Sequence, residues 1–312
     1  MPPASPASKQ ALSKSSRRRV CLLTGSAELD ADDNAALLAP AFAARDCDVE
    51  LACIDSLHLA AGRVLTRSSG SQQILDLGDC ALIWVLGFGQ RTSFLDKMQL
   101  LSLVPPEVRW VNSIAALLTL HGKYALAAAG CEVPHPATWA FNAVAPLIAT
   151  ARRKGGRFVL KPPGGSFGEG IVIADAESTV FADAATALTR GGAFCLLQRW
   201  VPEVTAGEFR VLVARGEVIG EYRRIGSGVA AANLARGGRA ELAPPDGKRH
   251  ALALTVAGWL EARGVGYAGI DLAGGMVLEV NIINPGGLAT LAALGAGQRA
   301  LAVVDALLAD SR

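Results

Sequence analysis

Short apolar runs that alternate with helix-like segments constrain the fold of this chain more than any other feature of its sequence. The runs are continuous rather than alternating, as expected for strands that are buried on both faces. The segments between them carry apolar residues at helical spacing, and one begins behind an aspartate that can cap a helix. This pattern predicts an α/β fold that starts with a parallel sheet over residues 20–119. The strand candidates are "VCLLTG", "VELACI", "ALIWVL" and "VRWVN".

The pattern changes after residue 119, where we expect two further units. Residues 120–198 mix strands and helices around a glycine-rich loop and predict a small α+β lid. Residues 199–312 contain two hairpin patterns, "EFRVLVARGEVIGEYRRI" and "YAGIDLAGGMVLEVNI", and predict an antiparallel sheet with helices. Residues 1–19 are rich in Ser, Pro and basic residues and are predicted to be a disordered tail.

Composition excludes several classes of function. The formal net charge is only +2, and Lys and Arg are spread along most of the chain, so we expect no nucleic-acid partner. No apolar run approaches the roughly 18 residues of a membrane span, so we expect no membrane partner. Six cysteines without a CxxC pair are typical of a reducing compartment, and we predict a cytoplasmic protein.

The segment "KPPGGSFGEG", residues 161–170, places a lysine and four glycines between two strand candidates. It is neither a Walker A motif, because no Lys-Ser/Thr follows its last glycine, nor a GxGxxG fingerprint. A flexible hairpin of this kind can close its backbone N–H groups on phosphate oxygens, and Lys161 supplies a positive charge beside them. Taken alone, the loop fits an ordinary turn with a solvated lysine equally well.

Acidic and amide side chains near the end of the second hairpin suggest a metal site. Glu279 and Asn281 are two residues apart in a strand and share one face. Asp271 joins that face if the hairpin contains a bulge. Two carboxylates and an amide suit Mg²⁺, which binds oxygen ligands. The alternative is that these residues form the exposed face of an antiparallel sheet.

Polar residues in two apolar strands indicate an anion site nearby. Arg210 lies in "EFRVLV", where an unpaired guanidinium would be costly to bury, so we expect it to meet an anion. Glu208 points to the same face and can accept hydrogen bonds from ribose hydroxyls. Gln198 ends another buried strand, and Trp200 and Val201 follow in an apolar connector whose backbone can read an adenine edge.

Two more basic residues carry weaker signals. Lys123 in "HGKYAL" is by itself an ordinary solvated helix lysine. Arg91 follows a strand end in the first unit, where open α/β sheets bind ligands, and is the best candidate there for a substrate contact. The four histidines show no ligand spacing, and we assign none of them to a metal.

The order of these segments resembles the ATP-grasp superfamily and, within it, the bacterial glutathione synthetase family. The similarity runs from about Asn112 to Asn281. It implies a parallel-sheet pre-ATP-grasp domain, then a two-part ATP-grasp domain made of a lid and a C-terminal antiparallel sheet with helices. The segments that carry it are Lys123, "LKPPGGSFGEG", "LQRWVPE", "GEFRVLV" and "GIDLAGGMVLEVNIINPGG".

The resemblance also implies a role for each candidate residue. Mg²⁺, with Mn²⁺ as an alternative, would bind Asp271, Glu279 and Asn281, and Arg210, Lys161 and Asn281 would be catalytic. Lys123 and Lys161 would hold the ATP phosphates beneath the loop from Gly164 to Gly170. The full ATP set is Lys123, Lys161, Gly164, Gly165, Ser166, Gly168, Gly170, Gln198, Trp200, Val201, Glu208 and Arg210.

The implied reaction phosphorylates a carboxylate to an acyl phosphate, which an amine then attacks with release of ADP and phosphate. The expected substrates are small molecules: ATP, γ-glutamylcysteine and glycine. Two alternatives stay open, namely an ATP-grasp ligase with other substrates and a non-catalytic ATP-binding protein. The resemblance further favours a homo-oligomer.

Two segments depart from the family pattern. The family's mobile loop carries an arginine where this chain has Ala231 and Ala232, and Arg224, Arg236 or Arg239 are candidate substitutes. The family's "NVTSPT" is here "NIINPGG", so that Asn284 replaces a serine.

Overall fold

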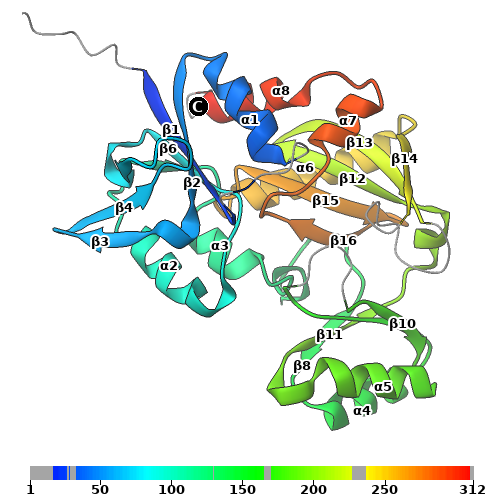
Figure 1. Cartoon of the computed structure of the whole chain (residues 1–312). Helices are drawn as coiled ribbons and strands as arrows, with labels where there is room; N and C mark the ends of the chain where they lie inside the picture. Colours follow the sequence, from blue (N-terminus) through cyan, green and yellow to red (C-terminus); the bar gives the residue numbers. More distant parts are fainter. Residues whose placement is uncertain are drawn as a thin grey trace, which may run out of the picture.

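A computed structural model describes residues 17–26, 28, 33–128, 130–164, 170–226 and 237–309 of the chain. Figure 1 shows a parallel sheet at the left, an antiparallel sheet at the right and a small α+β unit below them. This arrangement confirms the predicted fold class. The first strand begins at Arg18, inside the predicted tail, while residues 1–16 lie outside the described part. The predicted domain bounds 20–119, 120–198 and 199–312 stay predictions.

The first sheet is parallel throughout, with strand order β2-β1-β6-β7. Its central strand packs on both faces, because Leu23 belongs to one hydrophobic core and Leu22 to another. Both faces are therefore covered, as the continuous apolar runs predict. The elements of this unit are β1 (Arg18–Thr24), α1 (Asn34–Ala43), β2 (Cys47–Cys53), β6 (Leu82–Val85), α2 (Phe94–Leu101), β7 (Arg109–Trp110) and α3 (Ile114–Leu120).

Side-chain caps fix the beginnings of two of these helices. The Asp33 carboxylate accepts a hydrogen bond of 2.8 Å from the backbone N–H of Ala35 and starts α1. The Ser113 hydroxyl accepts one of 3.2 Å from Ala116 and starts α3. The helix that the sequence suggests beyond residue 120 ends early, because Lys123 has a positive φ of 62°.

A small antiparallel sheet, which was not expected from the sequence, follows β2. Its strands are β3 (His58–Ala60), β4 (Arg63–Arg67) and β5 (Ile74–Asp76). They are only three to five residues long and carry several exposed side chains, so their apolar periodicity is too weak to identify.

The C-terminal sheet is antiparallel and has the order β14-β13-β12-β15-β16. Both expected hairpins are present, and the first turns at Arg215 and Gly216, which both have positive φ. Strand β14 and helix α7 were not predicted from the sequence. The elements are β12 (Glu208–Ala214), β13 (Glu217–Ile225), β14 (Arg239–Leu242), α6 (Gly247–Glu261), β15 (Tyr267–Ala273), β16 (Met276–Asn281), α7 (Leu288–Ala293) and α8 (Arg299–Leu308).

The first and last units share their cores. One core joins Leu23 to Val213, the other joins Leu22 to Leu212, and α1 packs beside α8. Buried Asn112 strengthens the junction: its amide donates to the carbonyl oxygens of Tyr267 (3.0 Å) and Ile282 (2.7 Å) and accepts from the backbone of 266–267. The two units therefore form one packed body.

The lid has a core of its own. Its antiparallel sheet has the order β10-β9-β11-β8, and the helices α4 and α5 cover one face of it (Figure 1). All the buried residues of this core come from the lid. Its elements are β8 (Thr138–Phe141), α4 (Val144–Lys154), β9 (Arg157–Lys161), β10 (Val172–Asp175), α5 (Thr179–Leu188) and β11 (Cys195–Arg199).

A buried lysine holds the loop between β6 and α2, which carries Arg91. The Lys97 ammonium pairs with Asp55 and donates to the carbonyl oxygens of Phe88 (2.6 Å) and Gln90 (3.0 Å). Asp55 in turn accepts from the backbone N–H of Gln90 at 3.1 Å. The pair thus fixes the backbone on the N-terminal side of Arg91.

Lys97→Met is expected to destabilise the fold by about 1–3 kcal/mol, because it removes the buried cation that pairs with the partly exposed Asp55 carboxylate and leaves two carbonyl groups without their donor. Urea denaturation measures the loss. The double variant Asp55→Asn/Lys97→Met should lose less than the sum of the single variants. Lys248→Met, at an exposed lysine of α6, is the matched control and should change stability little. A loss for Lys97→Met no larger than for this control would contradict the assignment.

No helix in the described ranges is both long and apolar enough to cross a membrane. The six cysteines are all free thiols.

Candidate functional site

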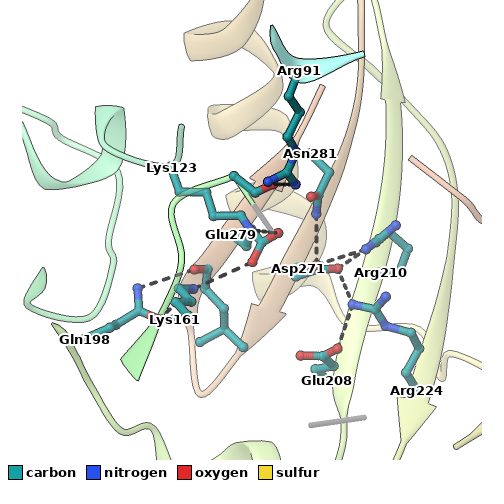
Figure 2. Close-up of polar contacts among 12 residues, drawn as sticks. Arg91, Lys123, Lys161, Gln198, Glu208, Arg210, Arg224, Asp271, Glu279 and Asn281 are labelled. Atoms are coloured by element: carbon teal, nitrogen blue, oxygen red, sulfur yellow. Dashed lines mark hydrogen bonds and ion pairs between the residues drawn. The ribbon is translucent and has the colours of Figure 1, made fainter. Parts of the chain in front are cut away.

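Two clusters of charged side chains lie next to each other where the lid meets the C-terminal sheet. Figure 2 shows both clusters along β15 and β16. The first is centred on Glu279 and contains Lys123 and Lys161. The second is centred on Asp271. Residues of the predicted lid and C-terminal units form the clusters, and Arg91 of the first unit lies near them (Figure 2).

In the first cluster, two lysines from separate segments converge on one carboxylate. Lys123 Nζ lies 3.3 Å from Glu279 Oε1, and Lys161 Nζ lies 3.6 Å from Glu279 Oε2. The Lys161 side chain is only 7% exposed, and its burial lowers the pKa of its ammonium while the charge of Glu279 opposes that shift. Lys123 lies in the left-handed turn after α3. It is therefore not the ordinary solvated helix lysine that the segment "HGKYAL" suggests by itself.

Gln198, at the end of β11, links the lid to the C-terminal sheet. Its Oε1 accepts from Lys161 Nζ at 3.2 Å, and its Nε2 donates to Thr138 Oγ1 at 3.1 Å. Nε2 also lies 3.5 Å from the carbonyl oxygen of Leu278 on β16. Lys161 is therefore oriented by hydrogen bonds as well as by charge.

In the second cluster, one carboxylate is shared by two arginines. Asp271 Oδ1 accepts from Arg210 Nε and from Arg224 Nη2, each at 2.6 Å. Asp271 Oδ2 accepts from Arg210 Nη2 at 3.0 Å and from Asn281 Nδ2 at 3.2 Å. Arg224 Nη2 also lies 2.6 Å from Glu208 Oε1. Buried Arg210 therefore pairs with an anion, as predicted, and that anion is the Asp271 carboxylate of the protein itself.

A β-bulge brings the two clusters together. The register of β15 and β16 shifts between Asp271 and Leu272, so Asp271 lies opposite Glu279 rather than opposite Leu278. Without that extra residue, Glu279 would turn to the other face of the sheet. The bulge that the sequence analysis required is therefore present, and it places both carboxylates on one face.

The two carboxylates of the second cluster have opposite pKa shifts. Burial alone would raise the pKa of Asp271, but Arg210 and Arg224 hold it at about 2. Burial raises the pKa of Glu208 to about 7, and Arg224 only partly opposes this effect. The difference arises because Asp271 has two arginine partners while Glu208 shares one.

Glu208 is therefore expected to make stability depend on pH near neutrality. Folded Glu208 keeps its proton above the unfolded pKa of about 4.3, so its stabilising contribution is complete below that pH and is lost as pH rises through about 7. Between pH 5 and 8, the unfolding free energy of the wild type should fall by roughly 1–3 kcal/mol relative to that of Glu208→Gln. Urea denaturation across this range tests it. A constant difference between the two proteins would show that Glu208 does not titrate there.

The structure brings most of the predicted site residues together, but not all. Glu208, Arg210, Lys123, Lys161 and Gln198 lie in or beside the two clusters, as do Asp271, Glu279 and Asn281. The backbone N–H of Trp200 donates to the carbonyl oxygen of Arg157 at 3.1 Å and is therefore not available to adenine. The next residue, Val201, is buried.

The glycine loop is described only at its two ends. Arg91 Nη2 lies 3.5 Å from the carbonyl oxygen of Gly164. Arg91, the predicted substrate contact of the first unit, therefore lies at the start of the loop. Gly170 has a positive φ of 69° at the other end. Gly165, Ser166 and Gly168 lie outside the described residues, as do Ala231, Ala232 and Arg236.

Arg224 was predicted only as a substitute for a missing loop arginine. It lies in the second cluster, between Asp271 and Glu208, because a bulge at Leu212/Val213 places it opposite Glu208. The other candidate substitute that is described, Arg239, is an exposed residue that pairs with Glu241.

The clustered oxygen atoms fit a divalent cation. Asp271, Glu279 and Asn281 offer carboxylate and amide oxygens from neighbouring strands, and oxygen is the donor type that hard cations bind. Both carboxylates already pair with cationic side chains, Glu279 with Lys123 and Asp271 with Arg210. No group of three or more His, Cys, Asp or Glu side chains suited to a metal occurs among the described residues, so a cation here would also need Asn281 or ligand oxygens.

Solved structures share the architecture of this chain and identify its fold. The chain superposes on D-cycloserine synthetase DcsG with a TM-score of 0.67, at 18% identity over 92% of this chain and 98% of that one. It superposes on a RimK-domain ATP-grasp protein from Sphaerobacter thermophilus with a TM-score of 0.64, at 22% identity over 93% and 99% of the two chains. The fold is that of the ATP-grasp class.

Sequence comparison identifies the family within this class. Residues 135–295 match the family described as prokaryotic glutathione synthetase, ATP-grasp domain. The glutathione synthetase of Synechococcus elongatus is 31% identical over 232 residues, which cover 69% of this chain and 68% of that protein. That of Parasynechococcus marenigrum is 35% identical over 147 residues, 46% of this chain and 48% of that protein. The chain belongs to the prokaryotic glutathione synthetase family, whose members are ADP-forming ligases that make C–N bonds with ATP and a divalent metal ion.

Proposed function

We propose that the protein is a glutathione synthetase, which joins γ-glutamylcysteine to glycine through an acyl phosphate and releases ADP and phosphate. The observation that carries this proposal is the convergence of Lys123 and Lys161 on Glu279, beside the Asp271 cluster, in a chain of this family. Such a site has cations for phosphates and oxygen ligands for a metal, and it needs no covalent nucleophile.

The lysines and arginines have separate tasks in this proposal. Lys123 and Lys161 hold the ATP phosphates, with Lys161 aimed by Gln198. Arg210 and Arg224 lie on the far side of Asp271 and neutralise charge that develops on the transferred phosphoryl group and the acyl phosphate. Trp200 and Val201 border the adenine, and Glu208 accepts from the ribose hydroxyls. The glycine segment 164–170 covers the phosphates and excludes water.

Asp271, Glu279 and Asn281 would hold the divalent cation, which we assign as Mg²⁺, with Mn²⁺ as an alternative. When bound, the cation neutralises charge on the ATP phosphates and orients them. Asn281, which donates to Asp271, keeps that carboxylate directed at the site. We further propose that the protein is cytoplasmic and forms a homo-oligomer. We also propose that its domains span residues 20–119, 120–198 and 199–312.

A screen for ADP and phosphate release tests the proposal. The purified protein is incubated with ATP, Mg²⁺ and pairs of an acyl donor and an amine. Release that requires both γ-glutamylcysteine and glycine supports the proposal. Release with another pair shows an ATP-grasp ligase of different specificity. Binding of ATP with no release for any pair shows a non-catalytic ATP-binding protein.

A further inference from the structure

A cavity of roughly 230 Å³ lies between the first sheet and the segment that follows β16. Its walls come from the end of β1, the end of β6, the start of α1 and Asn284. The glycines at the two strand ends touch: a Cβ at Gly87 would lie only 2.4 Å from the backbone nitrogen of Gly25. The lining residues are Thr24, Gly25, Ser26, Glu28, Asp33, Leu86, Gly87 and Asn284.

The topology of the first sheet favours a ligand at this place. After β1 the chain adds β2 on one side and β6 on the other, so the strand order reverses between β1 and β6. Open parallel sheets bind ligands beyond the carboxyl ends of their strands at such a reversal. Thr24 is the last residue of β1, and Leu86 directly follows β6, so the cavity occupies this position.

The cavity is joined to the ATP-grasp site by one short segment, 284–286. On the cavity side, Asn284 Nδ2 donates to Asp33 Oδ2 at 3.1 Å, and buried Asn34 donates to the carbonyl oxygen of Pro285 at 3.0 Å. On the other side, Arg210 Nη1 donates to the carbonyl oxygen of Gly286 at 2.9 Å. A ligand that extends past this segment can therefore touch both places.

The lining chemistry calls for a hydrogen-bond donor with positive charge. Glu28 and Asp33 supply two carboxylates, and none of the eight described lining residues is basic. The Oδ1 atom of Asn284 is buried and has no hydrogen-bond partner within the described part of the chain. An ammonium group satisfies both features, because it has three donors and no acceptor.

The helix end beside the cavity does not reverse this conclusion. The N-terminus of α1 carries a partial charge of about +0.5, which is smaller than the charge of two carboxylates. Asp33 also caps that end directly. The cavity is smaller than the about 300–1,000 Å³ typical of whole-ligand pockets, so it suits one end group of a longer substrate.

We infer that this cavity binds the α-ammonium group of the acyl donor, at the γ-glutamyl end in the proposed reaction, while the α-carboxylate on the same carbon points out of the cavity and the carboxylate to be phosphorylated lies toward Arg210. The inference rests on the proposed function for the identity of the donor. Glu28, Asp33 and Asn284 then determine substrate specificity, at a place separate from the nucleotide and the metal ligands.

The test removes the charge of the cavity while keeping its shape. Glu28→Gln is isosteric, and Asp33→Asn keeps a residue that caps helices equally well. The control is Glu177→Gln/Asp183→Asn, which makes the same two changes on exposed residues of the lid. The probes are γ-glutamylcysteine and glutarylcysteine, which lacks only the α-amino group. Far-UV circular dichroism verifies that each variant is folded. If the double variant is not folded, the single variant Glu28→Gln is used in its place.

The wild type and the control should prefer γ-glutamylcysteine over glutarylcysteine by about 10- to 100-fold in kcat/KM, as expected for a hydrogen bond between charged groups. The preference should fall to about threefold or less in Glu28→Gln/Asp33→Asn, with the KM for ATP equal to that of the control. A preference that survives unchanged in the variant, or that the wild type lacks, overturns the inference.

Failure of the ligase proposal gives a different pattern. If the wild type releases no ADP with any substrate pair, binding of the same two probes is measured by calorimetry in the presence of a non-hydrolysable ATP analogue. Tighter binding of γ-glutamylcysteine by the wild type, lost in the variant, supports the cavity assignment without the ligase reaction. Equal binding of both probes overturns the cavity assignment as well.

Discussion

Glu279→Gln is expected to lower the rate of ADP release by at least about 10²-fold, the range found when one group that stabilises the transition state is removed. The neutral amide can no longer pair with Lys123 and Lys161, whose ammonium groups both lie within 3.6 Å of the carboxylate. Without Glu279, the pKa of Lys161 falls further below its ordinary value, because the charge of Glu279 opposes the effect of burial. The same substitution removes a metal ligand in our proposal.

Steady-state assays at increasing Mg²⁺ concentration measure this effect. Part of the lost rate should return at high Mg²⁺ if the metal site is weakened, while the loss of lysine pairing stays. Glu177→Gln is the control, because that glutamate is exposed on the lid. Turnover of Glu279→Gln at the wild-type rate and the wild-type Mg²⁺ requirement would refute the assignment of the site.

Arg210→Met is expected to destabilise the protein by about 3–5 kcal/mol and to abolish detectable turnover. The substitution leaves the Asp271 carboxylate buried with Arg224 as its remaining arginine, and removing one partner of a buried ion pair has this large effect. It also frees the carbonyl oxygen of Gly286. Arg210→Lys should recover stability only in part, since an ammonium cannot make the two-pronged contact with Asp271.

The pH dependence of this loss separates the ion pair from packing. In the wild type, the low pKa of Asp271 adds stability that is complete above the ordinary Asp pKa of about 3.9 and is lost as pH falls toward about 2. The variant lacks much of that contribution, so the difference between the two proteins should shrink as the pH drops through this window. Urea denaturation at pH 7, 4 and 3 measures it. A difference that is the same at all three values would point to packing alone.

Much of the fold was predictable because its signals are local. The strands of the first sheet are continuous apolar runs, Asp33 and Ser113 are helix caps in the expected places, and the hairpin turn at Arg215 and Gly216 lies where the pattern broke. The second hairpin was predictable as a hairpin, and its bulge only as the condition that would put Asp271 and Glu279 on one face. The strands, caps and turns are determined by neighbouring residues in the sequence.

The remainder depended on register and on distant contacts. Regular pairing from the Arg215–Gly216 turn would set Arg223 opposite Glu208, whereas the bulge in β12–β13 sets Arg224 there. A bulge of this kind follows from packing of the whole sheet and leaves no mark in the pattern of apolar residues. The contact between Asp33 and Asn284 spans 251 residues, so nothing near either residue could have indicated the cavity.

The shared cores of the first and last units have a mechanical consequence. Glu279, Arg210, Asp271 and the cavity all belong to one packed body, whereas Lys161 and Gln198 belong to a lid with its own core. On the proposed function, a rotation of the lid would therefore change the contacts to the nucleotide and leave the cavity proposed for the acyl donor unchanged. ADP could then be exchanged for ATP while the acyl donor stays bound.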